Sequence, residues 1–271
     1  MARGFKRIYF QSFAVKMENV LIIFLKYPEP GKVKTRLAKA LGDEKACAIY
    51  KSLAENVLKN VFMKNSRIYD VHIFFTPADK ETEIKDWLKP ILNDNLGVKI
   101  QFSPQEGRNL GERMSNAFRQ ILQEKGYKEC ITQRTATESP LKKGDEGGCK
   151  KNSQERKFLR NTIIIGTDCP EIDATLIENA FEILKGKDIV IGPCRDGGYY
   201  LLGMSRPASD LFVDIDWSTD RVFEQTMEKI RKNNLSCSIL KTLVDIDTIE
   251  DLYHYSPHLN KPEVKNENYK I

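Results

Sequence analysis

The chain has 271 residues, of which 41% are hydrophobic and 30% are charged, as in an ordinary soluble globular protein. No apolar run approaches the roughly 18 residues that span a membrane as a helix, so a membrane-spanning protein is excluded. The net charge of +5 lies mostly in two segments: residues 1–16 hold four basic residues and no acid, and residues 125–160 hold ten against five acids. The remainder of the chain therefore carries a net charge of −4, and we do not expect the protein to bind nucleic acid.

The domain boundaries follow from composition. Residues 1–16 would suit an organelle-targeting peptide, but we expect a disordered extension. A single domain is then expected over 17–260, interrupted by a flexible polar insertion at 127–157 and followed by a tail at 261–271. The six cysteines form no Cys-x-x-Cys pair and have no histidine at metal spacing, which predicts reduced thiols and a cytoplasmic protein.

Short β-branched runs alternate with amphipathic segments along the chain. The predicted strands are 20–25, 71–76, 98–102, 162–166, 188–192, 199–204 and 237–243. The predicted helices are 43–62, 109–125, 173–186 and 219–233. This alternation predicts an α/β fold with a mostly parallel central sheet covered on both faces. Because no helix separates 188–192 from 199–204, we expect a local antiparallel element there.

The loop after the first predicted strand reads "PEPGKVKTRL" (28–37) and has the composition of a phosphate-binding turn. It is not a Walker A loop, because Val33 follows Gly31-Lys32 where Ser or Thr is required, and Lys26 stands where the first glycine should be. Its three basic residues alternate, and a glycine allows close backbone approach. The loop therefore predicts a di- or triphosphate site, with a solvated basic turn as the alternative.

Acidic residues follow three other predicted strands. Asp168 in "GTDCPEI" suits a divalent metal, although it could instead cap a turn before Pro170. Asp196 opens an Asp-Gly-Gly bend that is also typical of a simple hairpin. Asp247 in "VDIDTIEDLYH" precedes Thr248, which can cap a helix. Since ligands of open α/β sheets bind beyond the carboxyl ends of the strands, we expect these acids to share one crevice.

Taken in order, the motifs resemble a known family of transferases. The motifs are "FLKYPEPGKVKTRL", "GRNLGERMSNAF", "GTDCPEI", "GPCRDGGYYLLG", "DIDWST" and "DIDTIEDL". The chain resembles the rSAM/selenodomain-associated transferase 1 family, which is related to the phospholactate and molybdenum-cofactor guanylyltransferases. The resemblance covers about 17–126 and 158–255. It implies a glycosyltransferase-A-like three-layer αβα sandwich that uses Mg²⁺ or Mn²⁺.

The resemblance also implies roles for individual residues. The donor phosphates and nucleotide would be held by Gly31, Lys32, Lys34, Thr35, Arg36, Gly107, Leu110, Gly111 and Arg113. The acceptor side would be lined by Gly197, Gly198, Tyr199, Tyr200 and Trp217. The metal would bind Asp168 and Asp247, and the catalytic residues would be Asp168, Asp196 and Lys34.

Two reaction types and one non-catalytic role stay open. The family's usual label favours glycosyl transfer from a sugar nucleotide to a small acceptor, and the alternative is transfer of a nucleotidyl group to a phosphorylated acceptor. The chain has Thr167-Asp168-Cys169 where such glycosyltransferases carry Asp-x-Asp, and its first loop is less glycine-rich than in the nucleotidyltransferases. The third hypothesis is a nucleotide-binding protein without turnover.

Overall fold

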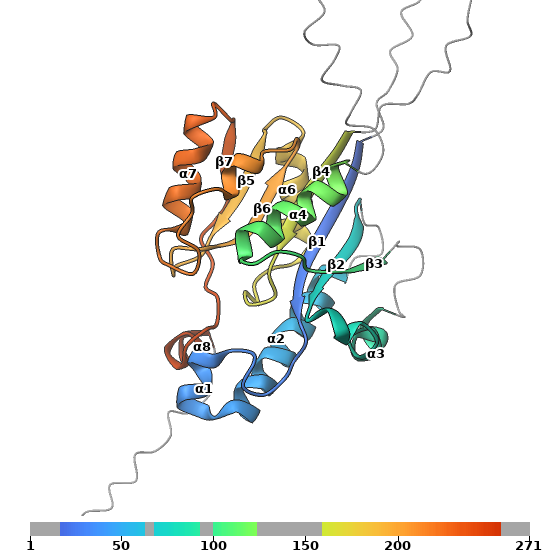
Figure 1. Cartoon of the computed structure of the whole chain (residues 1–271), viewed down its shortest axis with the longest axis vertical. Helices are drawn as coiled ribbons and strands as arrows, with labels where there is room; N and C mark the ends of the chain where they lie inside the picture. Colours follow the sequence, from blue (N-terminus) through green and yellow to red (C-terminus); the bar gives the residue numbers. More distant parts are fainter. Residues whose placement is uncertain (1–16, 63–67, 93–99, 124–158, 256–271) are drawn as a thin grey trace, which may run out of the picture.

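A computed structural model describes residues 17–62, 68–92, 100–123 and 159–255 (Figure 1). The predicted extension at 1–16, the insertion at 127–157 and the tail at 261–271 lie outside the described residues. Among the described helices, none is long and apolar enough to cross a membrane.

The described residues contain a seven-stranded, mostly parallel sheet in the order β3-β2-β1-β4-β6-β5-β7. Its strands are β1 (Met17–Lys26), β2 (Asp70–Thr76), β3 (Ile100–Pro104), β4 (Leu159–Ile165), β5 (Ile189–Pro193), β6 (Tyr199–Met204) and β7 (Cys237–Ile239). Only β6 runs antiparallel to its neighbours, β4 and β5. The predicted parallel sheet and the antiparallel element at 188–204 are both confirmed.

Seven described α-helices and two short 3₁₀ turns accompany the sheet. They are α1 (Thr35–Leu41), α2 (Asp43–Phe62), η1 (Ala78–Lys80), α3 (Glu81–Leu92), α4 (Leu110–Gln123), α6 (Ala174–Leu184), η2 (Ser209–Phe212), α7 (Val222–Lys232) and α8 (Ile249–Tyr255). Helix α3 was not among the predicted helices. The strand predicted over 237–243 stops at Ile239, and Leu243 then makes only an isolated parallel bridge with Cys194.

Alternate residues of the central strands supply the two halves of the core. In β1, Leu21 and Ile23 pack with α2, α3 and α6 on one face, whereas Val20 and Ile22 pack with α4 and α7 on the other. Side chains of a strand alternate between faces, so a strand that is apolar at every position is buried on both sides. The result is the predicted three-layer αβα arrangement (Figure 1).

A third, smaller core cluster joins helices that are distant in sequence. Leu37 of α1, Ala46 and Leu53 of α2, and Leu252 of α8 pack around Ile246, which is fully buried. Helices α1 and α8 therefore lie together beside one end of the sheet (Figure 1). This cluster holds the loop after β1 against the segment before α8, and those two segments carry the basic and acidic residues singled out above.

Candidate active site

Lys34 is the buried cation of the site. It precedes α1 with φ +47°, a left-handed conformation that costs a non-glycine residue on the order of 1–3 kcal/mol. Its side chain is only 4% exposed, and its Nζ lies 2.5 Å from Asp168 Oδ1 and 2.9 Å from Asp247 Oδ1. The backbone of the loop thus aims one ammonium between two carboxylates that are far apart in sequence.

The two carboxylates keep Lys34 charged. Burial by itself would lower the pKa of Lys34, but the charges and hydrogen bonds of Asp168 and Asp247 outweigh it and raise the pKa above its ordinary value. A lysine that stays protonated cannot act as a general base near neutral pH. Lys34 can act only as a fixed positive charge and hydrogen-bond donor.

The segment before α8 is fixed to the end of β4. The amide of Ile246 donates to the carbonyl of Asp168 at 3.1 Å, which places Asp247 beside it. A reciprocal cap then begins α8: the Thr248 amide and hydroxyl each donate to Asp251 Oδ2 at 2.8 Å, and the Asp251 amide donates to the Thr248 hydroxyl. The predicted cap at Thr248 is confirmed, and its effect is to hold Asp247 at the pocket.

A second pair of carboxylates lies next to the first. Asp196 stands in the turn between β5 and β6, where its Oδ1 accepts a 2.8 Å hydrogen bond from the Gly198 amide. Asp245 lies two residues before Asp247. Burial raises the pKa of Asp245 to about 6, and repulsion from Asp196 and Asp247 adds to the rise. Ligand atoms of Cys194, Asp196 and Asp245 lie within 4.8 Å of one another, so this acidic group could hold a cation.

Gly197 makes the turn that carries Asp196. Its φ is +87°, and a Cβ there would lie 1.9 Å from the Asp220 carbonyl oxygen. The carbonyl of Gly197 also accepts a 2.8 Å hydrogen bond from the Phe223 amide, just inside α7. A residue with a side chain cannot occupy this position without moving the backbone.

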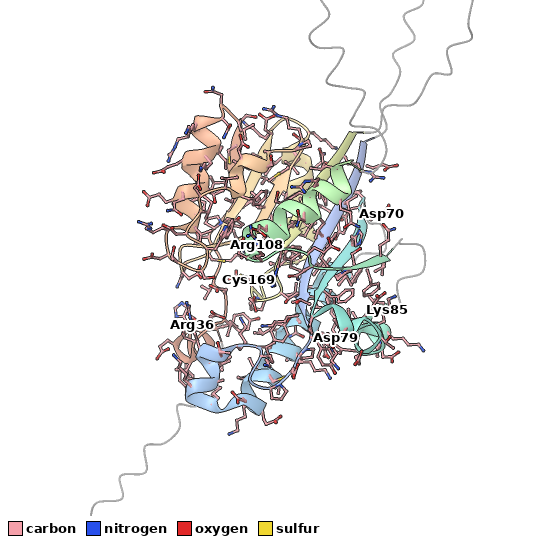
Figure 2. The ribbon with its side chains drawn as sticks, in the orientation of Figure 1. Arg36, Asp70, Asp79, Lys85, Arg108 and Cys169 are labelled. Carbon is pink, nitrogen blue, oxygen red and sulfur yellow. The ribbon has the colours of Figure 1, made fainter. Side chains whose placement is uncertain are left out.

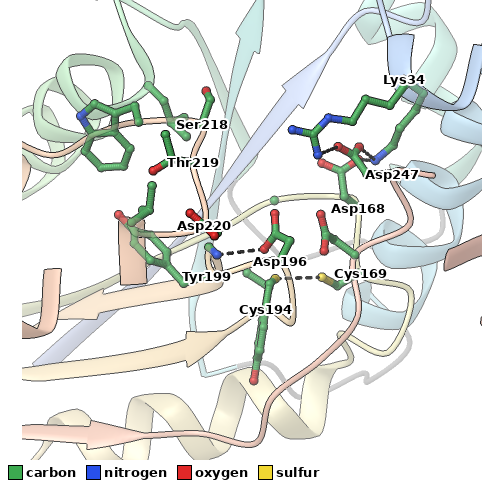
Figure 3. Close-up of a pocket in the computed structure, with 18 of the residues that line it drawn as sticks. Lys34, Asp168, Cys169, Cys194, Asp196, Tyr199, Ser218, Thr219, Asp220 and Asp247 are labelled. Atoms are coloured by element: carbon green, nitrogen blue, oxygen red, sulfur yellow. Dashed lines mark hydrogen bonds and ion pairs between the residues drawn. The ribbon is translucent and has the colours of Figure 1, made fainter. Parts of the chain in front are cut away.

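All four carboxylates line a pocket of about 730 Å³ (Figure 3). Lys34 and Asp247 lie on one side of it, and Ser218, Thr219 and Asp220 lie on the opposite side. Arg36 reaches from α1 toward this end of the sheet, with Nη1 3.5 Å from Asp247 Oδ2, and is 59% exposed (Figure 2). A neighbouring pocket of about 510 Å³ shares Lys34, Asp168 and Asp247 in its wall. The space is large enough for a small ligand such as a nucleotide.

Most residues of the predicted basic loop face this space. Lys32, Thr35 and Arg36 line the larger pocket together with Lys34. Gly31 is not a lining residue, and its positive φ of +75° instead shapes the turn. The loop is further tied to β1 because Lys26 Nζ donates to the Lys32 carbonyl at 2.5 Å.

The predicted nucleotide segment at the start of α4 is divided between lining and structural residues. Leu110 lines both pockets and Arg113 lines the smaller one. Gly107, at φ +140°, makes the turn into the helix, where its carbonyl accepts from Arg113 Nε at 3.2 Å. Gly111 packs under the indole of Trp217, since a Cβ there would come within 2.3 Å of the ring.

The predicted acceptor residues also occupy two environments. Gly198, Tyr199 and Trp217 line the larger pocket. Tyr200 belongs to its wall, but its side chain is buried and its hydroxyl donates to the Lys241 carbonyl at 3.0 Å. We assign Tyr200 to packing rather than to contact with an acceptor.

Sequence reasoning missed several lining residues. Asp245 precedes Asp247 by two residues in "VDID", and residues two apart on a strand share a face, so this spacing was the signal that could have identified it. Gln105 and Thr76 line the smaller pocket, but neither belongs to a charged or glycine-rich motif. Tyr50 of α2 reads as an ordinary core position, although its hydroxyl donates to the Lys26 carbonyl and accepts from the Lys26 amide.

Comparisons with known proteins point to transferases. A family described as an uncharacterised protein conserved in bacteria (DUF2064) matches residues 143–219. The 2-phospho-L-lactate guanylyltransferase of Methanocaldococcus jannaschii is 34% identical over 110 residues, which is 40% of this chain and only 47% of that protein. The enzyme of the same name from Methanobrevibacter ruminantium is 26% identical over 199 residues, 71% of this chain and 80% of that protein.

A solved structure extends the likeness over most of the chain. It is the crystal structure of a protein from Desulfovibrio desulfuricans G20 that carries the provisional name nucleotide-diphospho-sugar transferase. The two proteins are 29% identical, with a TM-score of 0.68 over 91% of this chain and 90% of that one. The predicted glycosyltransferase-A-like fold is thereby confirmed. All three of these similar proteins are named as transferases.

Proposed function

We propose that the protein is a nucleotidyltransferase that uses a nucleoside triphosphate and a small phosphorylated acceptor. The observation that carries this proposal is Lys34, buried between Asp168 and Asp247 on the wall of a pocket large enough for a nucleotide. Such an arrangement offers fixed positive charge and carboxylate oxygens at one point, which is what stabilisation of a phosphoryl transition state requires. The two guanylyltransferase relatives support the same reaction type.

The reaction is one substitution at phosphorus. An oxygen of the acceptor phosphate attacks the α-phosphorus, the bond from that phosphorus to the bridging oxygen of the β-phosphate breaks, and pyrophosphate leaves. Lys32 and Arg36 line the pocket and are exposed, and in this proposal they bind the leaving phosphates. Lys34 stays protonated and stabilises the charge that builds up as pyrophosphate departs.

The carboxylates fit a hard divalent cation. Asp168 and Asp247 are 44% and 35% exposed and both line the pocket. Lys34 lies against Oδ1 of each, and Arg36 Nη1 lies 3.5 Å from Oδ2 of Asp247. Carboxylate oxygens are the ligands that Mg²⁺ and Mn²⁺ prefer. We propose that these two residues hold such an ion, which when bound supplies Lewis-acid stabilisation of phosphoryl oxygens. Asp196 lines the same pocket, and we propose that it contacts the acceptor.

Glycosyl transfer is the second candidate. The structural neighbour from Desulfovibrio desulfuricans favours it, because its provisional name is that of a nucleotide-diphospho-sugar transferase. The same pocket would then hold a sugar nucleotide, and a nucleoside diphosphate would leave. The two reactions differ in the released product, which makes them easy to separate.

A product assay tests the proposal. The protein is incubated with each common nucleoside triphosphate, 2-phospho-L-lactate and Mg²⁺ or Mn²⁺, and release of pyrophosphate is followed; parallel reactions with sugar nucleotides are assayed for nucleoside diphosphate. Asp168→Ala should lower pyrophosphate release by about 10²-fold or more. Glu171→Gln is the matched control, because Glu171 pairs with Lys241 outside the pocket.

The outcomes separate the alternatives. Acceptor-dependent pyrophosphate release supports nucleotidyl transfer, and nucleoside diphosphate release supports glycosyl transfer instead. Thermal shift detects binding without any acceptor, since a ligand at about 100 times its Kd adds roughly 2.7 kcal/mol of stability. A shift with no product from either series would favour the non-catalytic nucleotide-binding role, and no shift with any nucleotide would refute all three.

A further inference from the structure

Two buried thiols meet on the wall of the larger pocket. Cys169 follows Asp168 after β4, and Cys194 follows β5; they are 2% and 9% exposed. Their Sγ atoms lie 3.7 Å apart, and both residues line the pocket. Figure 3 shows the pair next to the carboxylates of Asp168 and Asp196. Neither thiol has a role in the proposed reaction.

The distance between the sulfur atoms suits a shared cation. A covalent disulfide requires an S–S distance of about 2.0 Å, far shorter than the separation here. Two thiolates bound to one tetrahedral Zn²⁺ at about 2.3 Å each lie about 3.8 Å apart. The observed 3.7 Å is therefore close to the spacing at which one such ion would hold both sulfurs.

Carboxylate oxygens lie near the Cys194 thiol. The ligand atoms of Cys194, Asp196 and Asp245 are all within 4.8 Å of one another. Asp196 uses Oδ1 to accept from the Gly198 amide, and its carboxylate has a second oxygen. Cys169 is not in that group, and its Sγ adjoins it through the 3.7 Å contact with Cys194 Sγ. The four residues offer two sulfur and two oxygen donors, and carboxylates are accepted zinc ligands beside cysteine.

The backbone holds both thiols in place. The Cys194 amide donates to the Gly198 carbonyl at 3.0 Å, and Cys194 forms a parallel bridge with Leu243. The Cys169 carbonyl accepts from the Ile172 amide at 3.2 Å. A site whose ligands are already positioned loses little entropy when the metal binds.

We propose that Cys169 and Cys194, with Asp196 and Asp245, form a binding site for a thiophilic divalent cation, of which Zn²⁺ is the type and Cd²⁺ a probe. Binding forms two metal–sulfur bonds and releases the two thiol protons to solvent, so that no oxidant or reductant is needed. The sulfur donors distinguish this site from the hard-cation site proposed at Asp168 and Asp247. The inference does not depend on transferase activity.

The test is a titration of reduced, metal-free, full-length protein with Cd²⁺, followed by the ultraviolet charge-transfer absorption of cadmium–thiolate bonds. Four other cysteines could contribute, including two outside the described residues, so the titration is repeated on a variant that carries serine at those positions: Cys47, Cys130, Cys149 and Cys237. We expect one Cd²⁺ per chain in this variant, with the absorption of two thiolates, and competition by Zn²⁺ but not by Mg²⁺.

Single substitutions locate the ligands. Cys169→Ser and Cys194→Ser should each weaken binding by more than the 10- to 100-fold that loss of an outer-shell partner costs. Cys237→Ser is the matched control, because Cys237 lies in β7 and is not a pocket-lining residue; it should bind as the unmodified chain does. Asp245→Asn should weaken binding without removing the thiolate absorption.

Two results would overturn the proposal. One is the absence of thiolate absorption in the variant that retains only Cys169 and Cys194; the other is unchanged binding when either is replaced. If the multiple variant does not fold, crystals of the unmodified protein soaked in Zn²⁺ settle the question. An anomalous peak between the two sulfur atoms is expected, and a map with zinc only elsewhere would refute the site.

Discussion

Replacing Lys34 by methionine tests the electrostatic account of the site. Methionine has an unbranched side chain, as lysine has, and pays the same free-energy cost for the left-handed backbone conformation. The substitution therefore removes only the ammonium that bridges Asp168 and Asp247. At a charge separation of about 3 Å, each pair contributes about 5.5 kcal/mol at an effective dielectric of about 20 and about 1.4 kcal/mol in water. Breaking a buried pair costs about 3–5 kcal/mol. Because both carboxylates are partly exposed, we expect a loss of about 2–4 kcal/mol.

The assay is urea unfolding of the variant and of the unmodified chain, with and without Mg²⁺. Lys32→Met is the control, because Lys32 is exposed on the same loop. The raised pKa of Lys34 gives the sign of the pH effect: the stabilisation is full below the ordinary lysine pKa of 10.5 and is lost as pH rises through the higher folded value. Mg²⁺ should restore part of the loss, since a dication can replace the ammonium. A Lys34→Met variant within about 0.5 kcal/mol of the unmodified chain would refute the reasoning.

Three further predictions concern the scaffold and the metal. Asp188→Asn should destabilise by about 1–3 kcal/mol in urea unfolding near neutral pH, because Asp188 accepts from Arg206 and from the Ser236 amide and hydroxyl. Burial alone would raise the pKa of Asp188, but the hydrogen bonds from Arg206 and Ser236 lower it. The difference should therefore shrink as pH falls through the folded pKa, and a constant difference would contradict the account. Gly197→Ala should lower the thermal midpoint and weaken nucleotide binding together, because the new Cβ meets the Asp220 carbonyl; unchanged melting would show that the turn can relax. Chelation of divalent cations should weaken binding of nucleoside triphosphates in a thermal-shift assay, and equal shifts with and without chelator would argue against a metal site.

Much of the fold could be predicted because local patterns and tertiary structure agree. The run 43–62 repeats apolar residues at helical spacing, and α2 occupies those residues. The central strands are apolar on both faces because helices cover both sides. Residues 240–243 were wrongly included in the last strand. Leu243 belongs to the larger core cluster and Leu240 packs against it, while the Leu243 amide donates to the Pro193 carbonyl and the Leu243 carbonyl accepts from the Arg195 amide.

Which residues come together in the site was only partly predictable from the sequence. The predicted strand ends placed Asp168 and Asp247 in one crevice, as ligand sites of open α/β sheets are. The structure brings the two together by another route, because β7 ends at Ile239 and the Ile246 amide donates to the Asp168 carbonyl. Which lysine is buried between them could not be predicted, since Lys32, Lys34 and Arg36 look alike in sequence and only the left-handed turn at Lys34 selects one. The meeting of Cys169 with Cys194 was also unforeseen, because the two cysteines are 25 residues apart and show no metal-binding spacing.

The most direct test of the central claim is the metal dependence of triphosphate binding in Asp168→Ala. Calorimetric titration with a nucleoside triphosphate, at matched ionic strength with and without Mn²⁺, is carried out on this variant, on Glu171→Gln and on the unmodified chain. If Asp168 holds the ion beside Lys34, Mn²⁺ should strengthen binding to the unmodified chain and to Glu171→Gln but have little effect on Asp168→Ala. An Asp168→Ala variant that binds triphosphate with undiminished Mn²⁺ dependence would contradict the metal site and, with it, the proposed catalytic role of this pocket.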